Sequence, residues 1–277
     1  MYALATLANK NSLKDLKVFF YSLQLWNNTL PNVYVFCDSI TEEYLKTNPY
    51  KGKLIYKNVL DQYNGLNRSQ MEILPGKEYP TLFADFVIEK TYLMDWVFEE
   101  ESSILFCDAD ICFMGPLPAI DSSIKLGVSR HNIRLYDEQK YGVYNAGYLY
   151  SSDKTIPALW REFSKTSHFF EQASIEELVK EFCDSYIVFP NTVNYGWWRL
   201  LQGKESIEVL KHKWTFRREA NSCGILIEGE PLLSIHTHWK TKDQTTSYFN
   251  DFVLEHLEKL KSVEKTKQLL KFLRKII

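Results

Sequence analysis

The sequence has 277 residues, which suits one large α/β domain or two small ones with a substantial buried core. The formal net charge is −2 and the pI is near 6.3, which gives no support to nucleic-acid binding, since proteins of that class usually carry a strong excess of basic residues. Hydrophobic residues make up 45% of the chain, yet no uncharged apolar stretch approaches the roughly 20 residues that a membrane span needs.

Strand-like and helix-like segments alternate through the first half of the chain. Ser12 with Asp15 resembles a capping box that opens a helix to about Asn27. Thr81 is placed to cap a second helix, which ends at about Phe98. Apolar, β-branched and aromatic residues predict strands at residues 2–7, 32–37, 53–59 and 103–107. This order predicts an α/β fold with a mixed, mainly parallel sheet and helices on both of its faces.

The second half of the chain continues without a repeat or a Pro/Gly-rich linker. Further strands are expected between residues 125 and 151, and a further helix over residues 157–165. We therefore predict a single domain over residues 1–250, followed by a basic amphipathic helix over residues 251–277. From residue 259 onward this segment carries seven Lys or Arg against one acid, Glu264. Two interpretations fit it: a peripheral contact with an anionic membrane, or a helix docked on the domain with a solvated basic face.

The cysteines and the N-terminus bear on the compartment. Five cysteines are an odd number, and none forms a C-x-x-C pair. The first ten residues lack the basic and long apolar regions of a signal peptide. We expect free cysteines and a cytoplasmic protein.

Asp108 and Asp110 follow directly on the apolar run at residues 103–107. Ligands of open α/β sheets bind beyond the carboxyl ends of the strands. Two carboxylates spaced by two at such an exit converge on one hard cation, Mg²⁺ or Mn²⁺. The motif is common by chance, and its alternative is a loop whose aspartates are solvated or bind backbone N–H groups. The apolar strand in front of it favours the metal site.

Lys90 lies within the apolar stripe of the helix that follows Thr81. A lysine on such a face needs either an anion or a route to water for its ammonium group. One interpretation is that Lys90 binds a nucleotide phosphate near the strand ends. The other is a side chain that extends along the edge of the stripe into solvent.

Several segments in a fixed order resemble the GT-A class of nucleotide-sugar glycosyltransferases, such as glycogenin and bacterial or viral surface-glycan enzymes. Thr6-Leu7-Ala8-Asn9 is similar to the nucleotide loop after their first strand, and residues 104–117 are similar to their strand–D-x-D–strand segment. Tyr144-Asn145-Ala146-Gly147 resembles their N-x-G segment, and His236 with Lys242 resembles their late H-x5-K element. The resemblance covers about residues 2–243.

The resemblance implies a GT-A fold and a transfer of sugar from a nucleoside-diphosphate donor, with UDP as the expected nucleotide and a glycan or lipid-linked acceptor. It implies that Asp108, Asp110 and His236 hold Mn²⁺ or Mg²⁺, and that Asn145 and Gly147 meet the donor sugar. The donor-binding residues that it implies are Thr6, Leu7, Asn9, Lys90, Asp108, Ala109, Asp110, Asn145, Ala146, Gly147 and Lys242.

The sequence allows two interpretations of Asp38 and of Trp197-Trp198. Asp38 ends the second strand and either meets ribose or base, or belongs to a plain turn. Trp197-Trp198 either forms the floor of an acceptor site or belongs to the core. The D-Q pair of the family is replaced around Asn191–Asn194, which leaves a retaining or an inverting outcome open. An inverting enzyme needs a carboxylate base, for which Asp184 and Asp137 are candidates by position alone.

His236 and His238 compete for the place of the metal ligand. As strand residues spaced by two they would point to the same face, so position does not separate them. The spacing to Lys242 favours His236.

Two other functions compete with the glycosyltransferase. A phosphatase of the aspartyl-phosphate type also has an apolar strand and a D-x-D motif, although usually near the N-terminus. A non-catalytic module that binds a nucleotide sugar would use the same site without turnover.

Overall fold

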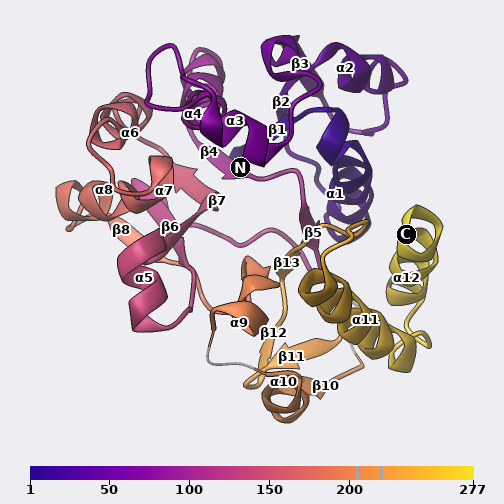
Figure 1. The fold of residues 1–277 in the computed structure, drawn as a ribbon. Helices are drawn as coiled ribbons and strands as arrows, with labels where there is room; N and C mark the ends of the chain where they lie inside the picture. The colour runs from indigo at the N-terminus through magenta and orange to yellow at the C-terminus, as the bar shows by residue number, and fades with distance from the viewer. Residues whose placement is uncertain (204–205, 219–220) are drawn as a thin grey trace.

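Seven strands form the main sheet of the computed structural model, which describes residues 1–203, 206–218 and 221–277. Their order across the sheet is β3-β2-β1-β4-β7-β6-β8 (Figure 1). The strands are β1 (Ala3–Ala8), β2 (Val33–Cys37), β3 (Leu54–Asn58), β4 (Ile104–Cys107), β6 (Leu126–Arg130), β7 (Tyr144–Ser151) and β8 (Tyr186–Val188).

The first four strands of this order run parallel, and β7 is antiparallel to both of its neighbours. The sheet is therefore mixed, as predicted. Every residue of β1, β2 and β4 is buried, because apolar layers cover both faces. One layer contains α1 (Leu13–Trp26), and the other contains α4 (Leu82–Val97) and α6 (Ile156–Ser164).

The two predicted helix starts had different outcomes. The Thr81 side chain accepts a hydrogen bond from the Ala84 N–H at 3.2 Å and caps α4, which confirms that prediction. The capping box at Ser12 and Asp15 was wrong, because Ser12 makes no side-chain cap to α1. The box here joins Asn9 and Ser12 one turn earlier, in the 3-10 helix Lys10–Ser12, and Asp15 turns toward the C-terminal part of the chain.

Two small sheets complete the molecule. The strands β5 (Ile111–Phe113), β13 (Ser234–His236) and β9 (Tyr195–Gly196) form one of them, beside the end of β4. The other contains β10 (Trp214–Phe216), β11 (Ile225–Ile227) and β12 (Glu230–Pro231). The remaining helices are α2 (Ser39–Leu45), the 3-10 helix Asp61–Tyr63, α3 (Arg68–Ile73), α5 (Leu135–Tyr141), α7 (Phe170–Ala173), α8 (Ile175–Glu181), α9 (Trp198–Leu201), α10 (Ile207–Lys213), α11 (Gln244–Lys259) and α12 (Glu264–Ile276).

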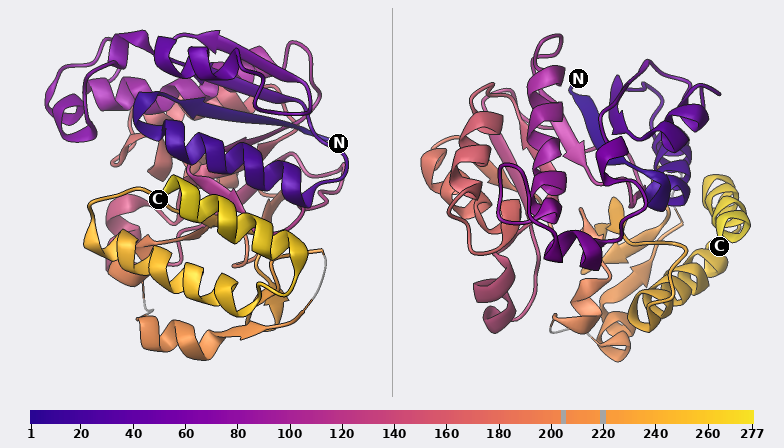
Figure 2. Two further views of the ribbon diagram at one scale, coloured as in Figure 1. Left: turned by 90° about the vertical axis from the view of Figure 1, so that its right-hand side faces the viewer. Right: turned by 45° about the horizontal axis from the view of Figure 1, so that its top comes forward.

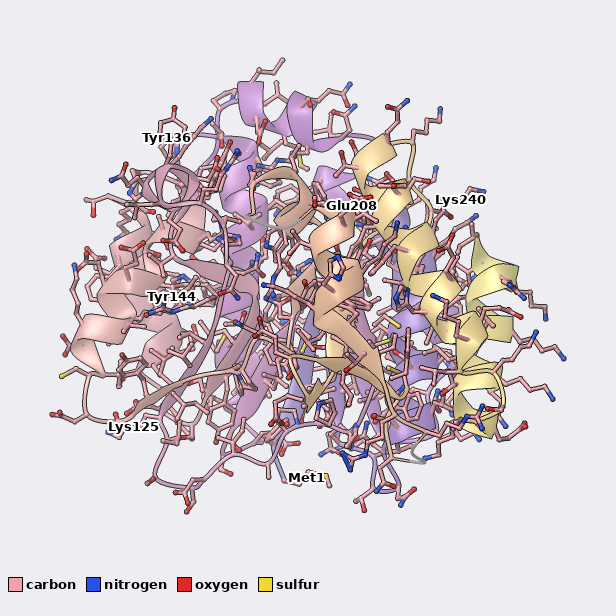
Figure 3. The ribbon with its side chains drawn as sticks, turned by 90° about the horizontal axis from the view of Figure 1, so that it is seen from below. Met1, Lys125, Tyr136, Tyr144, Glu208 and Lys240 are labelled. Atoms are coloured by element: carbon pink, nitrogen blue, oxygen red, sulfur yellow. The ribbon has the colours of Figure 1, made fainter. Side chains whose placement is uncertain are left out.

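The C-terminal segment consists of two helices that share the core of the domain. The predicted boundary at residue 250 falls inside α11. Helix α12 lies along α1 (Figure 2), where Leu269 and Leu273 are fully buried and Phe272 stacks on Tyr21 with ring centroids 3.9 Å apart. The apolar face of α12 thus packs against α1. Side chains that end in nitrogen extend from the two yellow C-terminal helices toward solvent (Figure 3). Among the described residues, no helix is long and apolar enough to cross a membrane.

Candidate active site

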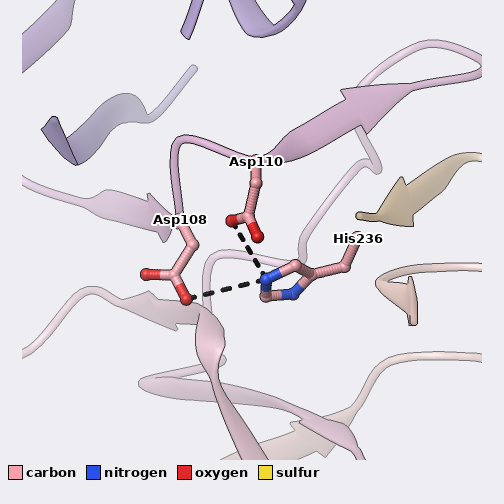
Figure 4. A group of neighbouring side chains, drawn as sticks. All are labelled: Asp108, Asp110 and His236. Carbon is pink, nitrogen blue, oxygen red and sulfur yellow. Dashed lines mark ion pairs between the residues drawn. The ribbon is translucent and has the colours of Figure 1, made fainter. Parts of the chain in front are cut away.

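The site begins at the carboxyl end of β4. Asp108 follows β4 directly, and Asp110 directly precedes β5. Strand β13 pairs antiparallel with β5 so that His236 lies opposite Ile111, next to Asp110. Two neighbouring strands thus bring a late histidine to the predicted D-x-D motif (Figure 4).

The three side chains converge on one point. The Nε2 atom of His236 lies 3.0 Å from Asp110 Oδ1 and 3.8 Å from Asp108 Oδ2. One ligand atom from each residue lies within 4.8 Å of the other two. Glycine at position 147 leaves room for this arrangement, because a Cβ atom there would displace the Asp108 carboxylate and the His236 ring.

A chain of hydrogen bonds fixes the orientation of the His236 ring. The Nδ1 atom of His236 is 2.9 Å from the side-chain oxygen of Asn194, which can only accept, so Nδ1 carries a proton. The Asn194 amide donates to Asn145 Oδ1 at 3.0 Å, and the Asn145 amide donates to Nε2 of His131 at 3.1 Å. His131 in turn donates from Nδ1 to the Gly142 carbonyl at 3.0 Å.

The hydrogen bond at Nδ1 also determines what Nε2, the other ring nitrogen of His236, can do. With Nδ1 protonated, a neutral ring presents the Nε2 lone pair to two carboxylates, an arrangement that repels unless a cation lies between them. Two carboxylates and one imidazole are a donor set that suits Mn²⁺ or Mg²⁺, with the imidazole favouring Mn²⁺. The bond from Nδ1 to Asn194 is the outer contact by which metal-binding histidines are usually oriented. Asp108, Asp110 and His236 therefore fit a divalent cation.

Charged side chains surround the cluster, of which Asp15 and Asp110 are buried and His238 is exposed. Burial alone would raise the pKa of Asp110, but the imidazoles of His236 and His238 hold it below its usual range. Burial raises the pKa of Asp108 despite the nearby Lys90. The carboxylates of Asp110 and Asp15 raise the pKa of His238 to about 9. His238 donates from Nδ1 to Asp15 at 3.0 Å, and its Nδ1 atom lies 3.5 Å from Asp110.

The cluster lies in a cleft of about 570 Å³. The cleft runs from the end of β1, past Asp108, to the start of β7 and to α7. Its lining includes the predicted residues Leu7, Asn9, Lys90, Asp108, Ala109, Asp110, Asn145, Ala146, Gly147, Trp197, Trp198, His236 and His238. Most of the donor residues that the resemblance implied therefore share one cleft.

Lys90 is buried in the cleft wall, and its ammonium group is paired with an acidic side chain and does not reach solvent. Its ammonium group lies 2.6 Å from Glu171 Oε1, 3.5 Å from the Ala146 carbonyl and 4.0 Å from Asp108 Oδ1. Burial alone would lower the pKa of Lys90, but Glu171 and Asp108 raise it. Lys90 is thus a charged residue that already has an acidic partner.

Five predicted residues do not line the cleft. Thr6 is buried inside β1, and Lys242 is exposed before α11. Asp38 is buried and caps α2 by accepting from the Thr41 N–H at 2.8 Å, which is the turn role. Asp137 is buried beside Arg134 at 2.9 Å, and Asp184 is exposed before β8. The geometry gives no support to Asp137 or Asp184 as a base.

Three residues that hold charged or metal-binding side chains of the site were not predicted from the sequence. Asp15 holds His238, Glu171 holds Lys90, and Asn194 holds His236. Asn194 is fully buried with a left-handed backbone, φ 55°, which asparagine tolerates better than most residues. The pattern at residues 12–15 predicts a capping role for Asp15, and nothing in the sequence near Glu171 distinguishes it from other glutamates. Asn194 stands in the segment that differs from the family pattern, which was the one available signal.

Solved glycosyltransferases share this fold. Mouse xyloside xylosyltransferase 1 has a TM-score of 0.52 at 14% identity, over 86% of this chain and 97% of that one. The galactosyltransferase LgtC, in complex with donor and acceptor sugar analogues, has a TM-score of 0.54 at 15% identity, over 96% and 99% of the two chains. The glycosyltransferase GlyE of Streptococcus pneumoniae has a TM-score of 0.55 at 14% identity, over 98% of this chain and 63% of that one.

These likenesses concern the fold alone, and they confirm the expected GT-A fold of the chain. This chain spans less than two thirds of GlyE. No protein-family model matches the sequence, and no curated protein matches it either.

Proposed function

We propose that the protein is a metal-dependent glycosyltransferase that moves a sugar from a UDP-sugar to a hydroxyl group of a glycan, glycoprotein or glycolipid. The observation that carries this proposal is the cluster of Asp108, Asp110 and His236 in the cleft of a fold that known glycosyltransferases share. The donor set and the oriented His236 ring support a cation between these side chains, and the glycine at position 147 leaves them room to converge.

The order of residues along the cleft supports one direction for the donor. Leu7 and Asn9, at the end of β1, would meet the nucleotide, because the parallel half of such sheets binds nucleotides at its strand ends. The diphosphate would lie at Asp108 and Asp110. The sugar would then lie toward Asn145–Gly147 and α7.

A divalent cation at this site would neutralise the negative charge that develops on the diphosphate as the sugar–phosphate bond breaks. His238, held by Asp15, adds a positive charge at the same end of the cleft. Both polar groups of the Asn145 side chain already have partners in His131 and Asn194. Asn145 would therefore shape the sugar subsite chiefly by holding the backbone of Gly147. Its Oδ1 atom accepts a hydrogen bond from the Gly147 N–H at 3.0 Å.

The acceptor would enter beside Trp197 and Trp198. The ring of Trp198 packs edge-on to His236, with centroids 4.8 Å apart, and its Nε1 donates to the His131 carbonyl at 3.0 Å. Trp198 is thus fixed, whereas Trp197 is partly exposed at the cleft. For a lipid-linked acceptor, we propose that the basic face of α12 approaches the membrane, since its apolar face packs on α1.

The test is release of UDP from a panel of UDP-sugars in the presence of Mn²⁺. Asp108→Ala and Asp110→Ala should abolish turnover, as should EDTA, while Asp121→Ala, an exposed aspartate outside the cleft, should leave it unchanged. Turnover that survives EDTA and both variants would contradict the proposal. Phosphate release from generic phosphoesters without any nucleotide sugar would favour the phosphatase. Metal-dependent UDP binding without any turnover would favour the non-catalytic module.

A further inference from the structure

The ion pair of Lys90 and Glu171 forms part of the cleft wall and joins residues 81 positions apart. The two side chains are only 4% and 6% exposed. Removing two charges from water costs several kcal/mol for each ion, and a partner at 2.6 Å offsets part of that cost. A buried ion pair in the wall of a ligand cleft therefore lowers the free energy gained on folding, which indicates that the pair has a function in the cleft.

The surroundings of Lys90 leave its ammonium group little freedom. It contacts Glu171 and the Ala146 carbonyl, and it lies 5.1 Å from the ring centroid of Phe106 and 5.9 Å from that of Trp160. To reach a diphosphate, the ammonium group would have to leave its acidic partner. Lys90 is thus better suited to hold Glu171 than to supply a free positive charge.

Glu171 is held in place from its backbone. Its carbonyl oxygen accepts from Trp160 Nε1 and from Ser174 Oγ, each at 2.7 Å. Only Oε1 is used by Lys90, and within the described residues Oε2 has no hydrogen-bond partner. Glu171 is among the residues that line the cleft, so Oε2 is the carboxylate oxygen that remains available to a ligand there.

The location of Glu171 indicates which part of the donor it would meet. The cleft passes from Asn9, past Asp108, to Ala146 and α7, and Gln172 contacts the Ala146 N–H at 3.4 Å. With the nucleotide at β1 and the diphosphate at Asp108, Glu171 lies at the sugar end. A carboxylate accepts hydrogen bonds from hydroxyl groups and repels another carboxylate.

We propose that Glu171 accepts a hydrogen bond from a ring hydroxyl of the transferred sugar, and that the donor carries a neutral sugar and not a uronic acid. Lys90 is the positioning residue that holds the carboxylate. This assignment rests on the proposed function and adds the chemical class of the sugar. Glu171 would then contribute to binding of the nucleotide sugar and not to binding of UDP alone.

The experiment measures dissociation constants with Mn²⁺ for UDP, UDP-glucose, UDP-galactose, UDP-xylose and UDP-glucuronate by calorimetry. The readout is the Kd of UDP divided by the Kd of the best neutral UDP-sugar, which we expect to exceed 1 in the wild type. Glu171→Gln should lower this ratio about 10-fold, because the neutral amide accepts the hydrogen bond of the sugar hydroxyl more weakly than the charged carboxylate does, while UDP affinity stays the same or rises. The wild type should bind UDP-glucuronate about 10-fold more weakly than the best neutral sugar, and Glu171→Gln should narrow that gap.

The matched control is Glu177→Gln, which removes an exposed glutamate paired with Lys180 at 2.7 Å and should leave the ratio unchanged. If Glu171→Gln fails to fold, Glu171→Asp keeps the charge but shortens the side chain, and it should also lower the ratio. Two results would overturn the assignment of Glu171 and leave the proposed function intact. One is a ratio in the folded variant within 2-fold of the wild-type ratio, and the other is equal affinity of the wild type for UDP-glucuronate and for the neutral UDP-sugars. Absence of metal-dependent binding of every one of these nucleotides would contradict the proposed function itself.

Discussion

His236 and His238 both reach the cleft, but their rings have different partners. Strand β13 ends at His236, so the alternation of a strand does not extend to His238. His236 turns Nε2 toward Asp108 and Asp110, and His238 turns Nδ1 toward Asp15. The geometry therefore supports the preference for His236 that follows from its spacing to Lys242.

We predict that His236→Ala lowers the affinity for Mn²⁺ at least about 10-fold in the presence of UDP, because it removes one of three protein ligands. His238→Ala should keep Mn²⁺ affinity within a few-fold, since its ring is engaged by Asp15. Calorimetric titration of Mn²⁺ into both variants checks this. A large loss in His238→Ala with none in His236→Ala would reverse the assignment.

His131 offers a test of the hydrogen-bond chain behind the metal ligands. Burial is the main cause that lowers the pKa of His131 to about 4, whereas an unfolded histidine titrates near 6.5. Between these values the unfolded chain binds a proton that the folded protein does not. The contribution of His131 to stability is therefore complete above about pH 6.5 and is lost as the pH falls toward 4, by about 2 kcal/mol at pH 5.

The prediction is that His131→Gln reduces the difference in unfolding free energy between pH 7.5 and pH 5 by about 2 kcal/mol. Urea unfolding at both pH values measures it, with His168→Gln, an exposed histidine, as the control. An equal pH dependence in wild type and His131→Gln would show that His131 is not held in the neutral form.

Short-range patterns could predict some elements but not others. Strand β4 and the cap of α4 were predictable, because an apolar run and a threonine before a helix act within a few residues. Strands β9 and β12 have two residues each, too few for any periodic pattern. The contact of Asp15 with His238 spans 223 residues, so only the tertiary fold reveals it.

Helix α12 illustrates how one pattern fits two structures. Its basic amphipathic sequence was open to a membrane contact or to docking, and its apolar face packs on α1. Leu269→Ala should therefore lower the free energy of unfolding by about 2–5 kcal/mol, since it leaves a cavity at a fully buried position.

Lys271→Ala, on the exposed face of the same helix, should change the free energy of unfolding by less than about 0.5 kcal/mol. Urea unfolding of both variants measures the contrast. Equal small effects would mean that α12 is not part of the folded core.

At the scale of the whole molecule, the fold collects the site from distant parts of the chain. The end of β1, the turn between β4 and β5, the start of β7 and the end of β13 all open into one cleft. Solved glycosyltransferases share the fold at 14–15% identity. The contacts that complete the site, such as that of Asp15 with His238, join segments far apart in the sequence and leave no local motif.

The central claim is that Asp108, Asp110 and His236 hold a divalent cation with a nucleoside diphosphate. Its most direct test is a titration of Mn²⁺ followed by electron paramagnetic resonance, with and without UDP, in the wild type, Asp110→Asn and the control Asp121→Asn. The account predicts that wild type and Asp121→Asn bind about one Mn²⁺ per chain, more tightly with UDP, and that Asp110→Asn loses at least about 10-fold in affinity. Wild-type protein that binds no Mn²⁺ with UDP, or an Asp110→Asn variant that binds it as tightly as the wild type, would contradict the account.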